Sequence, residues 1–370
     1  MPDVLMHGDT YRSPELRHEV PLGIADAFLY AEKDGVKHIA IGSMEIPRLA
    51  ELGLFELHPP ERYGVDELVD SGSSLAEIVE EIAVRAVKAF GIASAVVPPS
   101  FPLSLADRLR AEGIELAVDR DFFDERRRIK TDAELVGMRR AQRAAEAAMD
   151  AARELLRTRV QNGGLTVEEV KAAMNAVFVE HGTTADDFIV APGAQGAVGH
   201  DMGSGPIRPG VPIVIDIWPR DNESFIYCDM TRTFVVGDVP DDIREWHRLT
   251  KEALDRAISE IKDGADGRVI FDGTCEIYEA AGHPTQRTKA AGETLADGFF
   301  HGLGHGVGLE VHEQPDLGRT ASAPLKAGDV VTVEPGLYRV GYGGVRLEDI
   351  VLVTENGAEI LTNYPYDLAP

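Results

Sequence analysis

The sequence predicts an α/β domain over residues 1–128 followed by an α+β domain over residues 129–370. The chain has 370 residues, which is long enough for two hydrophobic cores. Short strands alternate with helices up to residue 124, whereas longer strands dominate beyond residue 187. The basic run ERRRIK at 125–130 lies between these two patterns of secondary structure, so we place the domain boundary near residue 128.

The first domain has the pattern of a sheet covered by helices. KHIAIG, SAVVPP and IELAVD are short, apolar and bounded by turn-forming residues, which is typical of buried strands. Apolar residues at helical spacing predict helices over residues 74–91, from Leu75 onward, and 103–113. This domain contains no cluster typical of catalysis, so we expect it to support a site elsewhere or to limit the substrate.

The basic run at 125–130 has two interpretations. It could bind nucleic acid, but in so acidic a chain we expect a solvated linker. Thr131 and Glu134 follow with the spacing of a capping box, which predicts the start of a long helix. Thr166 and Glu169 predict a second helix in the same way.

Two later segments share one layout of acidic residues on apolar strands. In the first, PIVIDIW contains Asp216 and DMTRTFVV begins with Asp229. In the second, Glu334 and Glu348 take the same places in VVTVEPG and VRLEDIVLV. We predict two hairpins, each with one carboxylate on each arm near its open end. Their similarity indicates an internal duplication whose halves face each other.

These acidic residues interrupt strands that are expected to be buried. An ionised carboxylate is costly to bury unless it is paired or binds a metal. Ion pairs with Arg232 and Arg346 inside the sheet are one interpretation. A metal site is the other, and the stretch HGLGHGVGLEVHE over 301–313 favours it, because imidazole and carboxylate together suit manganese, iron, cobalt or zinc. Two such ions can activate a shared water and polarise a carbonyl.

Four motifs carry a resemblance to a known family. DIWPRDNESFIYCDMTRTF, HGLGHGVGLEVHEQP, TVEPGLY and GGVRLED resemble the motifs of the pita-bread metallopeptidases, most closely the Xaa-Pro aminopeptidases and proline dipeptidases. Residues 1–128 resemble the creatinase-type N-terminal domain of that branch, and residues 129–370 resemble its α+β pita-bread catalytic domain. The resemblance therefore implies this fold for the whole chain.

The resemblance also implies a metal-binding role for particular residues. The implied ligands are Asp216, Asp229, His305, Glu334 and Glu348. Asp229 and Glu348 would bridge two divalent ions, and Glu334 would also take a proton from the attacking water. Manganese is the first choice of ion, with cobalt, zinc or iron as alternatives.

Other residues acquire catalytic roles from the same resemblance. His200 would face the scissile bond, and His312 would stabilise the tetrahedral oxyanion. His301 would lie near the proline side of the substrate. Arg346 would orient Glu348 or bind a substrate carboxylate in a bidentate manner.

Several conspicuous residues are expected to have no such role. Cys228 should point away from the ligand face of its strand and pack in the core. His58 and His283 lie beside prolines and are expected in surface loops. Trp218 stands where many relatives have glycine, and the connection that follows it is longer, so we expect a different hairpin tip.

Composition restricts the partners. A net charge of −26 repels phosphates and anionic lipid, so we expect no nucleic-acid or membrane partner. The start of the chain does not read as a signal peptide, and no apolar run could span a bilayer. With 2 cysteines there is no disulfide framework, and we expect a cytoplasmic protein.

The resemblance implies a metallo-exopeptidase that hydrolyses the bond between an N-terminal residue and proline in short peptides. It also implies a homodimer. A preference for dipeptides or for longer peptides is left open. Two alternatives on the same fold also stay open: a metal-dependent enzyme of the lyase type, and a non-catalytic interaction protein.

Overall fold

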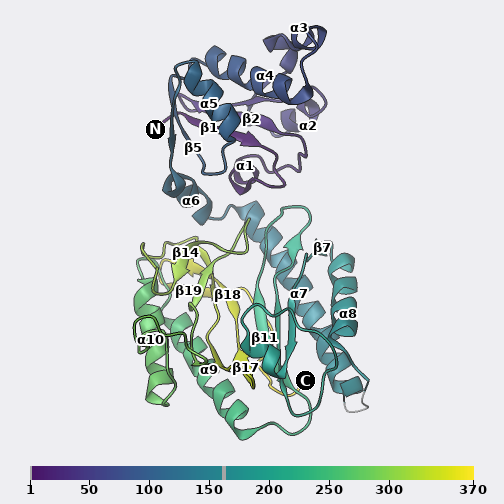
Figure 1. The fold of residues 1–370 in the computed structure, drawn as a ribbon, viewed down its shortest axis with the longest axis vertical. Helices are drawn as coiled ribbons and strands as arrows, with labels where there is room; N and C mark the ends of the chain where they lie inside the picture. The colour runs from purple at the N-terminus through teal and green to yellow at the C-terminus, as the bar shows by residue number, and fades with distance from the viewer. Residues whose placement is uncertain (1, 161–163) are drawn as a thin grey trace. The chain divides into compact units, whose positions relative to one another are not determined.

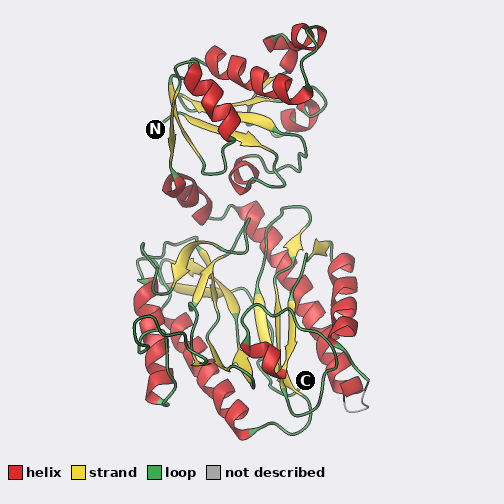
Figure 2. Cartoon of the chain, in the orientation of Figure 1, coloured by secondary structure: helices red, strands yellow, loops and turns green. Residues whose placement is uncertain are grey.

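The computed structural model describes residues 2–160 and 164–370 and divides the chain into two compact units, Met1–Arg127 and Arg128–Pro370 (Figure 1). Helices lie against strands in both units (Figure 2). None of the helices in the described part of the chain combines the length and the apolar character that crossing a membrane requires.

The first unit is built around a six-stranded sheet with the order β4-β3-β2-β1-β5-β6. Its strands are β1 (Val4–Gly8), β2 (Phe28–Lys33), β3 (Val36–Ala40), β4 (Glu56–His58), β5 (Ser94–Val97) and β6 (Glu115–Val118). Because successive side chains of a strand point to opposite faces, the sheet buries two apolar layers. The helices that contribute to these layers are α4 (Leu75–Ala89) and α5 (Leu103–Ala111) in one, and α1 (Pro14–Glu19), α2 (Ile46–Ala50) and α6 (Arg120–Arg128) in the other.

Helix α4 shows how local sequence sets an element in this unit. It begins at a capping box in which Ser74 and Glu77 bond each other's backbone, and it ends before Gly91, whose φ of 72° suits glycine. Ile78 and Ile82 are buried as the periodicity predicts. Leu75, the first residue of the helix, is exposed instead.

The prediction of a solvated linker at 125–130 is wrong. Helix α6 runs to Arg128, and the Arg128 side chain is buried. Its Nε and Nη2 atoms donate to the two carboxylate oxygens of Asp329 at 2.9 and 2.6 Å. Lys130 is similarly buried in an ion pair with Glu313. The acidic partners lie far along the chain, so the basic run alone did not reveal them.

The second unit places strands between two pairs of helices (Figure 1). The helices are α7 (Asp132–Arg159) and α8 (Val167–Glu180) on one side, and α9 (Asp241–Glu260) and α10 (Gly267–Ala280) on the other. Both predicted capping boxes, Thr131 with Glu134 and Thr166 with Glu169, are confirmed at the starts of α7 and α8. The strands belong to separate small sheets, with orders β10-β7, β11-β9-β8, β12-β16-β17 and β14-β13-β15-β18-β19.

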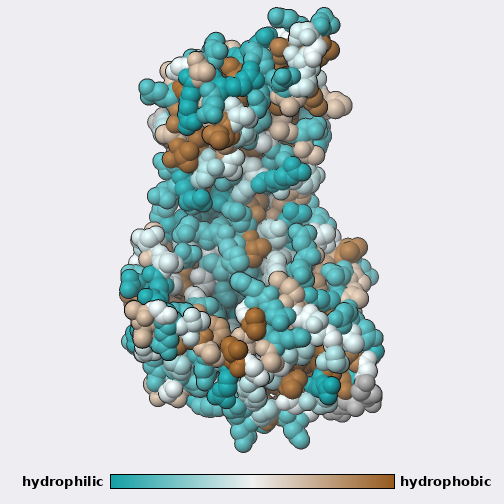
Figure 3. All heavy atoms as spheres, viewed as in Figure 1, coloured by the Kyte–Doolittle hydropathy of each residue, from teal (hydrophilic) through white to brown (hydrophobic). Residues whose placement is uncertain are grey.

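The strands of the second unit are short. They are β7 (Thr183–Thr184), β8 (Ile189–Pro192), β9 (Pro212–Ile217), β10 (Arg220–Asp221), β11 (Met230–Val235), β12 (Asp297–Gly298), β13 (Gly304–Gly306), β14 (Glu313–Leu317), β15 (Val330–Val333), β16 (Gly336–Arg339), β17 (Gly343–Arg346), β18 (Asp349–Thr354) and β19 (Gly357–Ile360). The visible face of the chain is mostly hydrophilic, with scattered apolar residues (Figure 3), in keeping with its acidic composition.

Both predicted carboxylate hairpins form, but the position of their acids was predicted wrongly. Strand β9 pairs antiparallel with β11, and β15 pairs antiparallel with β18. The register Asp216↔Thr231 places the acids beside the connection between the strands, not at the open end. The reason is that strands β11 and β18 begin directly after Asp229 and Glu348. Each of these acids therefore stands at the end of its strand that is next to the connection. The Glu348 backbone N–H donates to the Thr231 carbonyl at 3.1 Å, which brings the two connections together.

One of the residues expected to have no role needs correction. His58 is not in a loop: it ends strand β4 and is half-buried beside Phe90. His283 lies in the loop after α10, as predicted, and is half-buried with its ring 6.1 Å from that of Trp246. The prediction for Cys228 is confirmed, since its side chain is fully buried in the core beneath α7 and α8.

Candidate active site

A pocket of about 600 Å³ in the second unit collects every residue to which the resemblance assigns a metal-binding or catalytic role. Its lining includes Asp216, Asp229, His305, Glu334, Glu348, His200, His301, His312 and Arg346. Apolar side chains complete the wall, among them Trp218, Phe300 and Met202. The pocket therefore combines charged and imidazole groups on one part of its surface with an apolar part.

The acidic residues reach this pocket from the ends of paired strands. Asp216 projects from β9 and Asp229 directly precedes β11. Glu334 follows β15, and Glu348 directly precedes β18. Each hairpin thus supplies two carboxylates at its connection, which explains why four acids meet although they come from distant parts of the chain.

The donor atoms of the cluster converge. One carboxylate oxygen each from Asp229 and Glu348 and one ring nitrogen of His305 all lie within 4.8 Å of one another. His305 Nε2 lies 3.3 Å from Glu334 Oε1. Oxygen and nitrogen donors at such spacing form the kind of set that holds a divalent ion.

His305 is held in one orientation by its neighbours. Its Nδ1 atom must donate to the Gly306 carbonyl, 3.0 Å away, because a carbonyl only accepts. Nε2 then faces the carboxylates, and with a divalent ion bound there it would give up its proton and coordinate through its lone pair. The backbone N–H of His305 donates to Thr332 Oγ1 at 3.1 Å, which ties β13 to β15.

The glycines around His305 allow β13 to approach its neighbours. A Cβ atom on Gly304 would lie 2.0 Å from the Thr332 carbonyl oxygen. One on Gly306 would lie 2.4 Å from the Gln314 carbonyl oxygen. No side chain fits at either position, so glycine is required for this strand to present His305 to the pocket.

Burial dominates the electrostatics of the acids. Burial, and then repulsion from neighbouring carboxylates, raises the pKa of Asp229 and Glu348 well above the usual range. Burial also acts to raise the pKa of Glu334, but the hydrogen bond and charge of His305 outweigh it and hold that pKa below its usual value. Burial and mutual repulsion therefore oppose ionisation of Asp229 and Glu348, and a bound divalent cation would relieve both.

Two buried carboxylate oxygens lack hydrogen-bond donors within residues 2–160 and 164–370, which leaves a place for a cation beside each of them. Asp216 Oδ1 and Asp229 Oδ1 are buried and have no hydrogen-bond partner among the described residues. A buried carboxylate oxygen without a donor carries a cost of roughly 1–3 kcal/mol or more. Divalent cations next to these oxygens would remove that cost, so the residues present fit metal ions.

Arg346 is fixed within the pocket wall. Its Nη2 atom donates to Asp216 Oδ2 at 2.5 Å, and its Nε atom donates to Thr231 Oγ1 at 3.2 Å. Thr231 Oγ1 in turn donates to Glu348 Oε2 at 2.7 Å. Thr231 thus links Arg346 to Glu348 through two hydrogen bonds.

A second chain of hydrogen bonds ends at His301. Arg346 Nη1 donates to Tyr338 Oη at 3.1 Å, and Tyr338 Oη lies 2.9 Å from His301 Nε2. Because His301 Nδ1 donates to the Gly302 carbonyl at 2.7 Å, Nε2 accepts the tyrosine hydroxyl and the ring is neutral. Burial, in agreement, lowers the pKa of His301.

The other two histidines lie on the wall of the same pocket. The His312 ring centroid is 4.3 Å from that of His305, and the two rings meet edge to face. Burial, and then the neighbouring His305, lowers the pKa of His312, which favours its neutral form. His200 lines the pocket from the loop that follows the 3₁₀ helix Gly193–Ala197.

Sequence reasoning missed Thr231 and Tyr338. Thr231 stands two residues after Asp229 and therefore shares its side of the strand, a signal that strand alternation offered. Tyr338 gave a weaker signal, the run of glycines opposite it. A Cβ on Gly344 would lie 2.3 Å from the Tyr338 ring, so that glycine makes room for the tyrosine.

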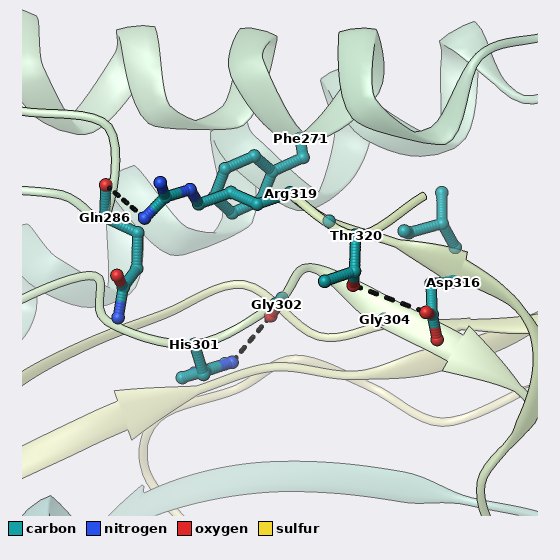
Figure 4. A pocket seen from close by; sticks show the side chains of 10 residues that line it. Phe271, Gln286, His301, Gly302, Gly304, Asp316, Arg319 and Thr320 are labelled. Atoms are coloured by element: carbon teal, nitrogen blue, oxygen red, sulfur yellow. Dashed lines mark hydrogen bonds between the residues drawn. The ribbon is translucent and has the colours of Figure 1, made fainter. Parts of the chain in front are cut away.

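A smaller pocket of about 230 Å³ shares His301, Gly302 and Gly304 with the larger one (Figure 4). Its far wall carries Arg319, whose Nη1 atom donates to the Gln286 carbonyl at 3.2 Å. Figure 4 shows this pair beside the Phe271 ring. The carboxylate cluster lies in the larger pocket, and we therefore assign the chemistry to that one.

Comparison of the amino-acid sequence with known proteins identifies a family and several relatives. The model of metallopeptidase family M24 matches residues 136–355. The Xaa-Pro dipeptidase of Pyrococcus furiosus is 35% identical over 251 residues, which cover 67% of this chain and 67% of that protein. The Xaa-Pro dipeptidase of Pyrococcus horikoshii is 30% identical over 291 residues, which cover 77% of this chain and 76% of that protein.

Solved structures extend the similarity over both units. An X-Pro aminopeptidase from Thermotoga maritima matches with a TM-score of 0.81 at 23% identity, covering 100% of this chain and 97% of that one. The prolidase from Pyrococcus horikoshii matches with a TM-score of 0.79 at 25% identity, covering 100% and 95%. These matches confirm the fold predicted from the sequence.

Proposed function

Because the chain belongs to metallopeptidase family M24, we propose that it is a dinuclear-metal exopeptidase that hydrolyses the bond between an N-terminal residue and proline. The convergence of Asp229, His305 and Glu348 within 4.8 Å carries this proposal. The names of the Pyrococcus relatives, Xaa-Pro dipeptidases, support the choice of bond.

We propose the five residues named from the sequence as the ligands of two divalent ions: Asp216, Asp229, His305, Glu334 and Glu348. The partnerless buried oxygens of Asp216 and Asp229 support this choice. We expect manganese first, with cobalt, zinc or iron as alternatives, since the mixed donor set accepts all of them. Divalent ions in such a site lower the pKa of water and polarise the scissile carbonyl.

The chain's own groups divide the remaining work. Glu334 accepts the proton of the attacking water, and the positive charge of the bound ions would keep its carboxylate ionised for that task. His312, on the pocket wall, donates to the oxyanion of the tetrahedral intermediate, and His200 faces the scissile bond. Removing one such donor typically costs about 10²–10³-fold in kcat.

Substrate selection is assigned to the apolar part of the pocket. Phe300 lies with its ring centroid 5.0 Å from that of Tyr338, next to His301, and this surface suits the proline ring. Trp218 forms another part of the wall, where its indole limits the width of the pocket. A volume of about 600 Å³ suits short peptides. We also propose a cytoplasmic homodimer, on the resemblance and the composition of the chain.

The test is release of the N-terminal amino acid from an Xaa-Pro dipeptide and from a tripeptide with proline in second place. Manganese-loaded protein should cleave at least one of them, and Glu334→Gln should not. Cleavage of the dipeptide alone identifies a dipeptidase, and cleavage of the tripeptide identifies an aminopeptidase. Two bound ions without cleavage would favour the lyase-type alternative, and no bound metal would favour the interaction protein.

A further inference from the structure

The first unit contains a second cluster of metal-binding groups, which the peptidase proposal does not use. His38 Nδ1 lies 3.2 Å from His58 Nε2 and 3.3 Å from Glu56 Oε2. All three donor atoms lie within 4.8 Å of one another. We propose that His38, Glu56 and His58 form a zinc site that is separate from the peptidase pocket.

Neighbouring strands of the sheet place these side chains on one face. Strands β3 and β4 run parallel, with His38 in register with Glu56. Glu56 and His58 are two residues apart on β4, so they point to the same side. Because β4 is the edge strand, this side remains reachable from solvent: the Glu56 side chain is 63% exposed and that of His38 is 13% exposed.

The spacing suits one ion better than it suits hydrogen bonding. Zinc–nitrogen bonds of about 2.0–2.1 Å at tetrahedral angles put neighbouring donor atoms about 3.3–3.4 Å apart. The two separations in the structure, 3.2 and 3.3 Å, are close to that value. Without a cation, His58 Nε2 and Glu56 Oε2 compete for the one proton on His38 Nδ1. Two imidazoles and one carboxylate are a known zinc ligand set, with water in the fourth position.

Surrounding aromatic groups fix both imidazoles. The His38 ring stacks on Phe90 with centroids 4.6 Å apart and planes 17° apart, and His58 lies 4.7 Å from the same ring. Tyr63 Oη lies 3.1 Å from His58 Nδ1. When that nitrogen donates to the tyrosine, the Nε2 lone pair is free for the ion, which is the usual outer arrangement around a zinc-bound histidine.

The charges around the cluster permit a cation. Arg62 Nη1 lies 3.5 Å from His58 Nδ1 and opposes a cation, but Arg62 is exposed and screened by solvent. The Glu56 carboxylate supplies the compensating charge.

This site is independent of the proposed peptidase chemistry. Its residues lie in the unit Met1–Arg127, and the peptidase pocket lies wholly in Arg128–Pro370. A bound ion would join the edge strand β4 to β3, so zinc should raise the melting temperature of the first unit. The site can therefore be tested whether or not the chain cleaves peptides.

The test is zinc content per chain after loading with excess zinc sulfate and removal of free metal by desalting. Wild type should retain one more zinc per chain than Glu56→Gln or His58→Gln. Glu51→Gln, the same change at another exposed position of the first unit, should match wild type. Glu56→Gln changes an exposed side chain without altering its shape, so it keeps the test valid if the His58 variant fails to fold.

Two results would overturn the proposal. Equal zinc content in wild type and Glu56→Gln would leave the cluster as a hydrogen-bonded group without a metal role. Loss of zinc together with loss of peptide cleavage would mean that the missing ion came from the peptidase pocket. Reduced zinc with unchanged cleavage, and a larger zinc-dependent rise in the melting temperature of the first unit in wild type and Glu51→Gln than in Glu56→Gln, is the supporting result.

Discussion

Replacing Gly304 by alanine should disable the peptidase pocket, although glycine takes no part in chemistry. A Cβ at this position would lie 2.0 Å from the Thr332 carbonyl oxygen, whereas carbon–oxygen contacts settle at about 3.3 Å or more. Strand β13 must therefore move away from β15 by about 1.3 Å at this point. His305, the next residue, would be carried with it.

The size of the effect follows from that displacement. A misplacement of about 1 Å in a catalytic arrangement can cost about 10²-fold in rate. Crowding of a packed strand pair typically costs about 1–3 kcal/mol of stability, so the variant should still fold. We expect Gly304→Ala to lose about 100-fold in kcat/KM and to retain less metal per chain.

Gly302→Ala is the matched control in the same stretch. Its added Cβ would lie 3.6 Å from the nearest atom, the Leu317 carbonyl oxygen, which is an ordinary contact. Steady-state kinetics on an Xaa-Pro peptide and metal analysis should separate the two variants. If Gly304→Ala were as active as Gly302→Ala, the close approach of β13 and β15 would not set the position of His305, and the reasoning would be refuted.

Three further predictions concern the pocket and its support. Thr231→Val removes the hydroxyl between Arg346 and Glu348 and should lower kcat/KM by about 10–100-fold, with activity recovered in Thr231→Ser; equal rates would contradict it. Arg128→Ala leaves Asp329 buried without its partner and should lower the free energy of unfolding of the second unit by about 3–5 kcal/mol. The exposed Arg157→Ala should change it by less than about 1 kcal/mol, and a similar loss in both variants would oppose this account. Chelation should abolish cleavage and manganese or cobalt should restore it; full activity in chelator would count against a metal-dependent site.

The sequence predicted elements best where the signal is local. Capping boxes set the starts of α7 and α8, and the apolar periodicity set α4, because these features depend on residues three or four positions apart. The hairpins were found from alternating apolar strands, but the position of their acids was not. Register decides that position, and the connection length alone does not show it.

The environment of residues whose partners lie far along the chain could not be predicted in the same way. Arg128 looked like part of a solvated linker because Asp329 lies some two hundred positions further along the chain. His58 looked like a surface residue because its neighbours His38 and Phe90 come from other elements. Tyr338 joins the site only through hydrogen bonds to Arg346 and His301, which the sequence does not reveal.

The most direct measurement of the central claim is the rate of Xaa-Pro dipeptide and tripeptide hydrolysis as metal-free protein is titrated with manganese. The account predicts no cleavage without metal, a rise with each equivalent, and a plateau at two ions bound in the peptidase pocket. Because the further zinc site lies elsewhere, Glu56→Gln should follow the same curve. Cleavage by metal-free protein, or no cleavage of either peptide with the pocket fully loaded, would contradict the account.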